Sequence, residues 1–235
     1  MMELSADQFE RLAQQIYQRL GLHFEEKKTY FLQKRVERRM ELLDLRDPQE
    51  YVFRLCFADP EGREMQALAN LITTNETYMF REYEQLEAFA NCCLPEVLSA
   101  KQARGEQTLR IWSAGCSSGE EPYTLAMILQ EVFPQSRYWD CEILATDIDQ
   151  NMLEQAAQAR YWWRSIRDVP AVYLDKYLAR DGDAYTVRPS TAALVRFEHL
   201  NLHDRAAMRA KRNFDFVFCR NVLIYFDDRS RKTAV

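Results

Sequence analysis

The segment from Ser113 to Pro122 (SAGCSSGEEP) constrains the fold of this chain more than any other. The apolar run Thr108–Trp112 before it predicts a buried strand, and a helix is predicted after it, over Glu121–Phe133. Gly115 permits a tight turn with close backbone approach, and Gly119 lets the helix begin against a ligand. A strand, a glycine loop and a helix in this order fit a site for a nucleotide-like cofactor, although such a loop taken alone is more often an ordinary glycine turn.

The alternation of strand and helix continues after this loop. Strands are predicted over residues 141–146, 194–200 and 214–219, and a helix over residues 150–160. This alternation predicts an α/β domain built on a parallel sheet. Within Leu174–Pro189, the turn signal Asp181-Gly182-Asp183 predicts a small hairpin.

The first hundred residues have a different pattern, in which only helices are predicted. Apolar residues between positions 5 and 20 recur at helical spacing, with Ser5 or Asp7 as a cap and Gly21 as the end. Further helices are predicted over residues 25–44, 49–57 and 62–72. We therefore expect an all-helical N-terminal domain over residues 1–90 and a linker helix over 91–106. The α/β domain is expected over 107–235, with a small β-subdomain at 170–192.

Composition narrows the possible classes of protein. Hydrophobic residues make up 47% and charged residues 29% of the 235 residues, as in globular domains. The six cysteines form no CxxC pair and there are only three histidines, which argues against a zinc site or a disulfide framework. The net charge of −5 argues against a general nucleic-acid binder. No apolar run is long enough for membrane insertion, and the acidic N-terminus is unlike a signal peptide, so a cytoplasmic protein is expected.

The residues around the glycine loop favour a particular kind of cofactor. No Lys-Ser or Lys-Thr follows Gly119, so the loop is not a P-loop, and it lacks the G-x-G-x-x-G fingerprint. Glu120 and Glu121 stand where a diphosphate would need donors, but they suit the cationic sulfonium of S-adenosylmethionine. Asp147, at the end of the second predicted strand, can accept hydrogen bonds from both ribose hydroxyls.

Four blocks of sequence carry a resemblance to a known family. They are Thr73–Arg81 (TTNETYMFR), Trp112–Tyr123 (WSAGCSSGEEPY), Ala145–Asp149 (ATDID) and Phe218–Phe226 (FCRNVLIYF). With these blocks in this order, the chain resembles the chemotaxis receptor methyltransferase (CheR) family over its whole length. The resemblance implies a helical domain followed by a Rossmann-like methyltransferase domain with a small β-subdomain. It also implies transfer of the methyl group of S-adenosylmethionine to glutamates on the cytoplasmic helices of chemoreceptors, with S-adenosylhomocysteine as the product.

The resemblance also implies a set of site residues. Asn75, Thr77 and Arg81 would reach the cofactor from the interdomain side, and Gly115, Glu121 and Asp147 would hold it from the loop and the second strand. The remaining positions are Asn201 and Leu202 near the adenine, and Arg220, Asn221 and Tyr225 at the reacting end. Arg81 would hold the substrate carboxylate and Tyr225 would orient the nucleophile or the methyl group. Outside these blocks, the same residue types would be ordinary: a surface arginine, helix caps and a core tyrosine.

Two departures from the family pattern bear on these expectations. Met79-Phe80 replaces the common Phe-Phe, which is a mild change. Val235 lies only ten residues after Tyr225, whereas the family's sheet continues, so we expect a fragment that lacks the end of the sheet. The alternatives to a glutamate methyltransferase are an S-adenosylmethionine sensor without catalysis and a small-molecule methyltransferase.

A basic stretch stands out in this acidic chain. Between Lys27 and Arg46 there are seven basic and three acidic residues, a local charge of +4. On a helix, Lys28, Arg35 and Arg39 fall within roughly 40° of one another. The sequence thus predicts a face that docks on acidic receptor helices, unless it is simply a solvated helix face.

Overall fold

The computed structural model describes residues 4–234, which divide into two compact units. The first, here the helical unit, contains the residues up to Thr74 together with 200–210 and those from Asn221 onward. The second, here the sheet unit, contains Asn75–His199 and Lys211–Arg220. Within residues 4–234, no helix is both long enough and apolar enough to cross a membrane.

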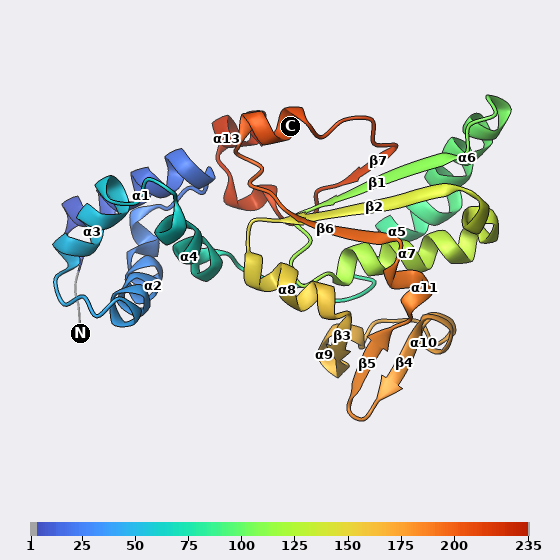
Figure 1. Cartoon of the computed structure of the whole chain (residues 1–235), viewed down its shortest axis with the longest axis horizontal. Coiled ribbons are helices and arrows are strands. Elements are labelled where there is room, and N and C mark those ends of the chain that lie inside the picture. The colour runs from blue at the N-terminus through green and yellow to red at the C-terminus, as the bar shows by residue number, and fades with distance from the viewer. Residues whose placement is uncertain (1–3, 235) are drawn as a thin grey trace. The chain divides into compact units, whose positions relative to one another are not determined.

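The helical unit begins with four amphipathic helices and closes with shorter turns from the end of the chain (Figure 1). Its elements are α1 (Ala6–Leu20), η1 (Glu26–Lys28), α2 (Thr29–Leu42), α3 (Pro48–Phe57), α4 (Arg63–Ile72), α12 (Arg205–Arg209), η4 (Leu223–Tyr225) and α13 (Asp228–Ala234). The predicted helices are confirmed, except that a 3₁₀ turn precedes α2. Local signals explain the bounds of α1: Ser5 and Gln8 form a reciprocal capping box, and Gly21 ends the helix with a φ of 73°.

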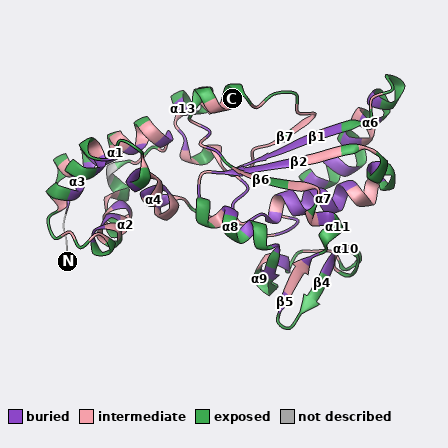
Figure 2. Cartoon of the chain, viewed as in Figure 1, coloured by how far each residue is buried: buried purple, intermediate pink, exposed green. Residues whose placement is uncertain are grey.

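The core of the helical unit lies where the apolar faces of these helices meet. Helix α1 packs on α3, and α2 packs on α4. The side chains between them are completely buried, among them Leu12, Ile16, Leu32, Val36, Leu55 and Leu68. The same faces carry the buried stripes in Figure 2. Most of the stabilisation of these short helices comes from this burial rather than from helix propensity.

The sheet unit is built on four parallel strands in the order β6-β2-β1-β7. They are β1 (Thr108–Ala114), β2 (Asp140–Asp147), β6 (Val195–His199) and β7 (Phe216–Phe218). Its helices and turns are α5 (Tyr83–Ala88), η2 (Phe89–Cys93), α6 (Leu94–Ala103), α7 (Glu120–Val132), η3 (Pro134–Tyr138) and α8 (Gln150–Gln158). The predicted parallel α/β arrangement is confirmed.

A second, smaller sheet forms the β-subdomain. It has the antiparallel order β3-β5-β4, with β3 (Arg160–Trp162), β4 (Leu178–Asp181) and β5 (Ala184–Val187). Three short helices accompany it: α9 (Trp163–Ile166), α10 (Ala171–Tyr177) and α11 (Pro189–Ala192). The predicted hairpin at residues 181–183 is present as β4 and β5. Strand β3 was not predicted, because its three residues begin two positions after the end of α8, where a helix was predicted to continue to residue 160.

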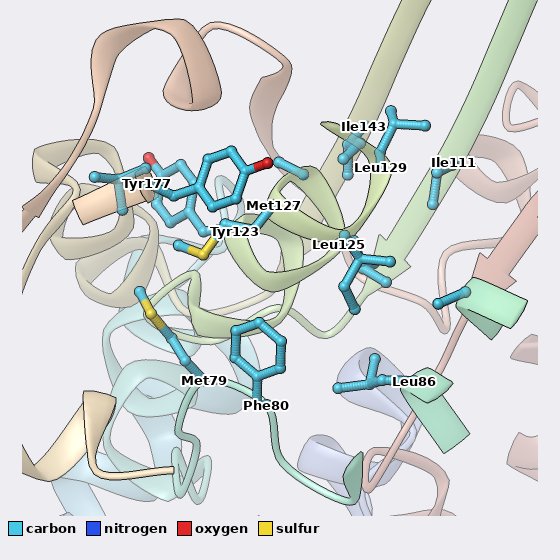
Figure 3. Close-up of a cluster of buried hydrophobic side chains, with 14 of the residues drawn as sticks. Met79, Phe80, Leu86, Ile111, Tyr123, Leu125, Met127, Leu129, Ile143 and Tyr177 are labelled. Atoms are coloured by element: carbon cyan, nitrogen blue, oxygen red, sulfur yellow. The ribbon is translucent and has the colours of Figure 1, made fainter. Parts of the chain in front are cut away.

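The core of the sheet unit surrounds α7, which runs along one face of the larger sheet (Figure 1). Leu125 and Leu129 of α7 lie against Ile111 of β1 and Ile143 of β2 (Figure 3). The same buried cluster contains side chains that precede the sheet in sequence, Met79, Phe80, Leu86, Phe89 and Leu94, and Phe89 packs edge-on against Phe216 and Phe218 of β7. These residues belong to the sheet unit, which begins at Asn75, whereas a linker helix was expected over residues 91–106.

Candidate cofactor and methyl-transfer site

The glycine loop joins the end of β1 to the start of α7. Gly115 and Gly119 adopt left-handed φ angles of 80° and 91°. The Gly115 N–H donates to Thr146 O at 2.8 Å, which ties the loop to the end of β2. A β-carbon at Gly119 would lie 2.8 Å from Ala156 Cβ, so the close approach of α8 requires glycine there.

Asp147 stands at the carboxyl end of β2, where the loop turns above the sheet edge. Its Oδ2 accepts the Ser117 N–H at 2.7 Å, and its Oδ1 accepts the Asp149 N–H at 2.9 Å. Burial raises the pKa of Asp147 above its usual value, and these two backbone donors oppose the rise. A carboxylate offers about four acceptor positions, so both oxygens keep capacity for further donors such as a pair of ribose hydroxyls.

The two glutamates that begin α7 have different roles. The carboxylate of Glu120 is buried and accepts hydrogen bonds from Ser118 Oγ at 2.7 Å and Ser165 Oγ at 2.8 Å, which brace the loop against α9. The carboxylate of Glu121 accepts from Ser113 Oγ at 2.7 Å and pairs with Arg220 Nη1 at 3.2 Å. Burial raises the pKa of both glutamates. Glu121 is the one with exposed surface, 15% of its side chain.

The segment from Asn75 to Glu82 is hydrogen-bonded to α7 and to Asp149, the residue that caps α8. Asn75 Nδ2 donates to Asp149 Oδ2 at 2.8 Å, two residues beyond Asp147. Phe80 N donates to Thr124 Oγ1 of α7 at 3.2 Å. Phe80 and Glu82 both have positive φ angles, 60° and 53°, which are uncommon for residues other than glycine and cost free energy. This strained turn contains Arg81 between its two unusual residues, and Thr77 is half-buried in the same segment.

Arg81 and Arg220 both donate hydrogen bonds to the segment between Glu76 and Gln85. Arg81 Nη1 donates to Glu76 O at 2.7 Å, and 26% of the Arg81 side chain is exposed. Arg220 donates to Arg81 O, to Gln85 Oε1 at 3.0 Å and to Glu121. Arg220 therefore links the start of α7 to the backbone of the strained turn, while Arg81 keeps exposed surface for a ligand.

Ser117 offers a test of whether a cofactor fits this loop. Its side-chain oxygen is buried and has no hydrogen-bond partner among residues 4–234. A buried hydroxyl without a partner is costly, so this oxygen marks a place where a polar ligand group would be stabilised. The loop contains two glutamates and no lysine or arginine, which suits an adenosyl cofactor with a cationic centre better than a phosphate. The residues present therefore fit S-adenosylmethionine.

The remaining predicted site residues belong to the helical unit: Asn201, Leu202, Asn221 and Tyr225. Asn201 Nδ2 donates to Arg19 O at 2.7 Å, so its amide is fixed at the end of α1. Leu202 is buried, and Asn221 has a positive φ of 57°. Tyr225 is half-buried in η4. The helical unit thus contains these four predicted site residues. The sheet unit contains the other seven: Asn75, Thr77, Arg81, Gly115, Glu121, Asp147 and Arg220.

The three residues predicted to dock on a receptor have unequal exposure. Lys28 is exposed. Arg35 lies 3.8 Å from the ring centroid of Phe31 and donates to a backbone oxygen at 3.4 Å. Arg39 forms a bidentate ion pair with Glu64, at 2.9 and 2.8 Å, and only 15% of its side chain is exposed. The exposed residues of α2 include Tyr30, Lys34 and Arg38, one turn apart, and after them Glu41, which pairs with Arg38, and Leu42.

Sequence patterns did not single out two residues of the site. Asp149 caps α8 by accepting from Asn151 N at 3.0 Å and also holds Asn75. An aspartate just before a predicted helix is a capping signal. Its hydrogen bond with Asn75, 74 residues earlier, cannot be predicted from local sequence. Ser117 was one of two adjacent serines, and its burial depends on the left-handed φ of 48° that it adopts.

Comparisons with known proteins identify the family to which this geometry belongs. Residues 75–235 match the SAM-binding domain of CheR methyltransferases, and residues 7–73 match their all-alpha domain. The chain is 40% identical over 228 residues to chemotaxis protein methyltransferase 2 of Vibrio cholerae, covering 97% of this chain and 78% of that protein. It is 34% identical to the chemotaxis protein methyltransferase of Borreliella burgdorferi, with 97% and 81% covered, and 33% identical to that of Escherichia coli, with 97% and 77% covered. The cofactor is S-adenosylmethionine, and the chain belongs to the CheR methyltransferase family.

Proposed function

We propose that this methyltransferase esterifies glutamate side chains on the cytoplasmic helices of chemoreceptors. The observation that carries the proposal is the strained turn at residues 80–82. It holds Arg81, a planar donor suited to a carboxylate, on a segment that Asn75 ties to Asp149, two residues beyond Asp147. The names of the relatives, chemotaxis protein methyltransferases, support the same assignment.

Several residues of the sheet unit would hold the cofactor. Asp147 would accept from the ribose hydroxyls, because two backbone donors already fix its orientation. Ser117 Oγ would gain the partner that it lacks within the described chain. Glu121 would offer negative charge near the cationic part of the cofactor. We assign Asn201 and Leu202 to the adenine, and Asn221 and Tyr225 to the reacting end, on the family pattern.

Methyl transfer to a glutamate carboxylate requires no proton transfer by the protein. S-adenosylmethionine, when bound, supplies a methyl group activated by its positive sulfur. A glutamate carboxylate is ionised at neutral pH and attacks without a general base. The task of the site is to align the attacking oxygen and to exclude water, which also favours a step in which opposite charges disappear. Arg81 would hold the carboxylate, and the Tyr225 hydroxyl would orient it.

Substrate docking is assigned to the exposed face of α2, with Lys28. Tyr30, Lys34 and Arg38 recur every fourth residue, and Lys34 Nζ lies 4.5 Å from the Tyr30 ring centroid. Such a face suits an acidic helix that presents glutamates. Arg39 forms a mostly buried ion pair with Glu64 within the helical unit, so we do not assign it to docking.

The test is methyl transfer from radiolabelled S-adenosylmethionine to the purified cytoplasmic fragments of the chemoreceptors of the same organism. Base-labile label on the receptor is expected, because carboxylate methyl esters hydrolyse in alkali. Arg81→Ala should lower kcat/KM for the receptor by about tenfold or more, since charge-assisted hydrogen bonds contribute about 1.5–3 kcal/mol.

Two variants sharpen this experiment. Arg81→Lys keeps the charge but loses the planar fork, and we expect intermediate activity. Arg104→Ala removes an exposed arginine at the end of α6 and should behave like wild type. Cofactor binding without any transfer to a receptor would instead point to a sensor, and wild-type turnover in Arg81→Ala would remove the role assigned to Arg81.

A further inference from the structure

The carboxyl end of α1 gathers two segments that lie far away in the sequence. Both segments, 200–210 and 221–235, belong to the helical unit together with α1. They carry four residues of the proposed site, yet they follow the strands of the sheet unit in sequence. The contacts that fix them on α1 are specific and separate, one set for each segment.

The first set holds the segment around Tyr225. Tyr17 Oη of α1 donates to Asp227 Oδ2 at 2.9 Å. His23 N donates to the carbonyl oxygen of Tyr225 itself at 3.2 Å, and Leu22 forms an antiparallel bridge with Phe226. Three successive residues of this segment are therefore bound to Tyr17 of α1 or to Leu22 and His23, which follow Gly21.

Asp227 extends this hold to the next helix. Its Oδ1 accepts Ser230 N at 2.7 Å, so the same carboxylate that binds Tyr17 also caps α13. These hydrogen bonds, from Ser230 and then Tyr17, lower the pKa of Asp227, so it stays ionised at neutral pH. A charged acceptor makes the hydrogen bond from Tyr17 stronger than one between neutral groups.

The second set holds the segment around Asn201. Asn201 Nδ2 donates to the carbonyl oxygen of Arg19, one of the last carbonyls of α1, which have no partner within a helix. Asn201 Oδ1 accepts from His203 N at 2.9 Å, so one amide serves both the helix end and its own turn. The residue assigned to the adenine is thus positioned by α1.

Gly21 makes both sets of contacts possible at once. It has a φ of 73°, and its N–H donates to Tyr17 O at 2.9 Å. A β-carbon there would lie 2.7 Å from His203 Nδ1 and 2.8 Å from Phe226 Cε1. Those two rings come from the two distant segments, so they meet over Gly21, the residue that follows α1 and has no side chain.

We propose that the end of α1, through Tyr17 and Gly21, is a positioning element for methyl transfer. It fixes the backbone of Tyr225 at one side and the amide of Asn201 at the other. The inference rests on the function proposed above, because it takes Tyr225 to act at the reacting end. In this view the all-helical domain contributes to turnover as well as to docking.

The experiment is a double-mutant cycle on kcat for receptor methylation. Tyr17→Phe removes only the hydroxyl that holds Asp227, and we expect kcat to fall about threefold to tenfold, the loss expected for one hydrogen bond. In a Tyr225→Phe background the same substitution should have no further effect, because the group being positioned is already gone. Asp227→Asn keeps an oxygen that can accept from Tyr17, and it should retain most of the activity.

Controls separate positioning from simple loss of stability. Tyr138→Phe removes an exposed tyrosine hydroxyl and should leave kcat unchanged. Gly21→Ala should lower kcat and also weaken S-adenosylmethionine binding, because both segments shift; if it does not fold, the Tyr17 cycle still decides. Unchanged kcat in Tyr17→Phe, or an equal loss with and without the Tyr225 hydroxyl, would overturn the inference. Wild-type enzyme that methylates no receptor would contradict the proposed function instead.

Discussion

The carboxylate of Asp147 is oriented by two backbone N–H groups, from Ser117 and Asp149. We expect Asp147→Asn to raise the Kd for S-adenosylmethionine about tenfold to a hundredfold, because bonds to a charged acceptor are worth about 1.5–3 kcal/mol. Burial raises the pKa of Asp147, so protonation removes its acceptor capacity at a less acidic pH than for an ordinary aspartate. Wild-type affinity should therefore fall as the pH is lowered toward that raised pKa, and the asparagine variant should lack this dependence.

Calorimetric titration over a range of pH measures both effects on Asp147. Asp140→Asn serves as the matched control, since Asp140 begins the same strand and 66% of its side chain is exposed. Equal affinities for wild type and Asp147→Asn at neutral pH would refute the assignment to the ribose.

The residues of the site differ in how far the sequence could predict them. The positions of Asp147 at a strand end and of Glu121 at a helix start could be predicted from local patterns, and their roles toward the cofactor stay predictions. Ser117 and Asp149 could not be predicted, because their roles depend on a left-handed backbone and on a contact between residues 74 apart. Local sequence patterns predict the helix or strand on which a side chain lies, but its contacts depend on how distant segments pack together.

Helix α2 also shows that local patterns predict which residues are buried but not which distant residues they contact. Its apolar residues Leu32, Val36 and Met40 recur at helical spacing and are buried. The basic residues next to the stripe were assigned together to docking, but Arg39 pairs with Glu64, which also accepts from Tyr51 Oη at 2.9 Å. Glu64 lies 25 residues further on, on α4, so helix periodicity alone could not show that its carboxylate is buried beneath α2.

We therefore expect Arg39→Ala to destabilise the protein by about 3–5 kcal/mol, since it leaves the charge of Glu64 buried without its partner. Urea unfolding followed by circular dichroism measures this loss. Arg38→Ala is the control, because its bond to Glu41 at 3.0 Å is exposed and such pairs contribute about 0–1 kcal/mol. If both variants unfold at the wild-type midpoint, the ion pair does not stabilise the helical unit.

The order of a helical part before a sheet-containing part follows from the change of pattern near residue 107, whereas the compact units divide between Thr74 and Asn75. Residues 83–103 form helices, as most residues up to Ile72 do, and only their burial with α7 assigns them to the sheet unit. Segments 200–210 and 221–235 join the helical unit although they follow strands. The order of predicted helices and strands thus indicated the architecture, but which segments belong to each compact unit depends on long-range packing.

The exposed face of α2 provides a test at this scale, because docking concerns the protein and its substrate as a pair. We expect combined charge reversal at Lys28, Lys34 and Arg38 to lower kcat/KM for receptor methylation about tenfold or more at low salt. The reversal should also flatten the salt dependence, since exposed charges act mainly on association and are screened by ions. The Kd for S-adenosylmethionine should stay unchanged, because none of the three residues belongs to the proposed cofactor site. Reversal of Arg104, Arg137 and Arg212, exposed basic residues elsewhere, gives the same net charge and controls for it. An equal loss in both triple variants would mean that overall charge, and not this face, governs the encounter.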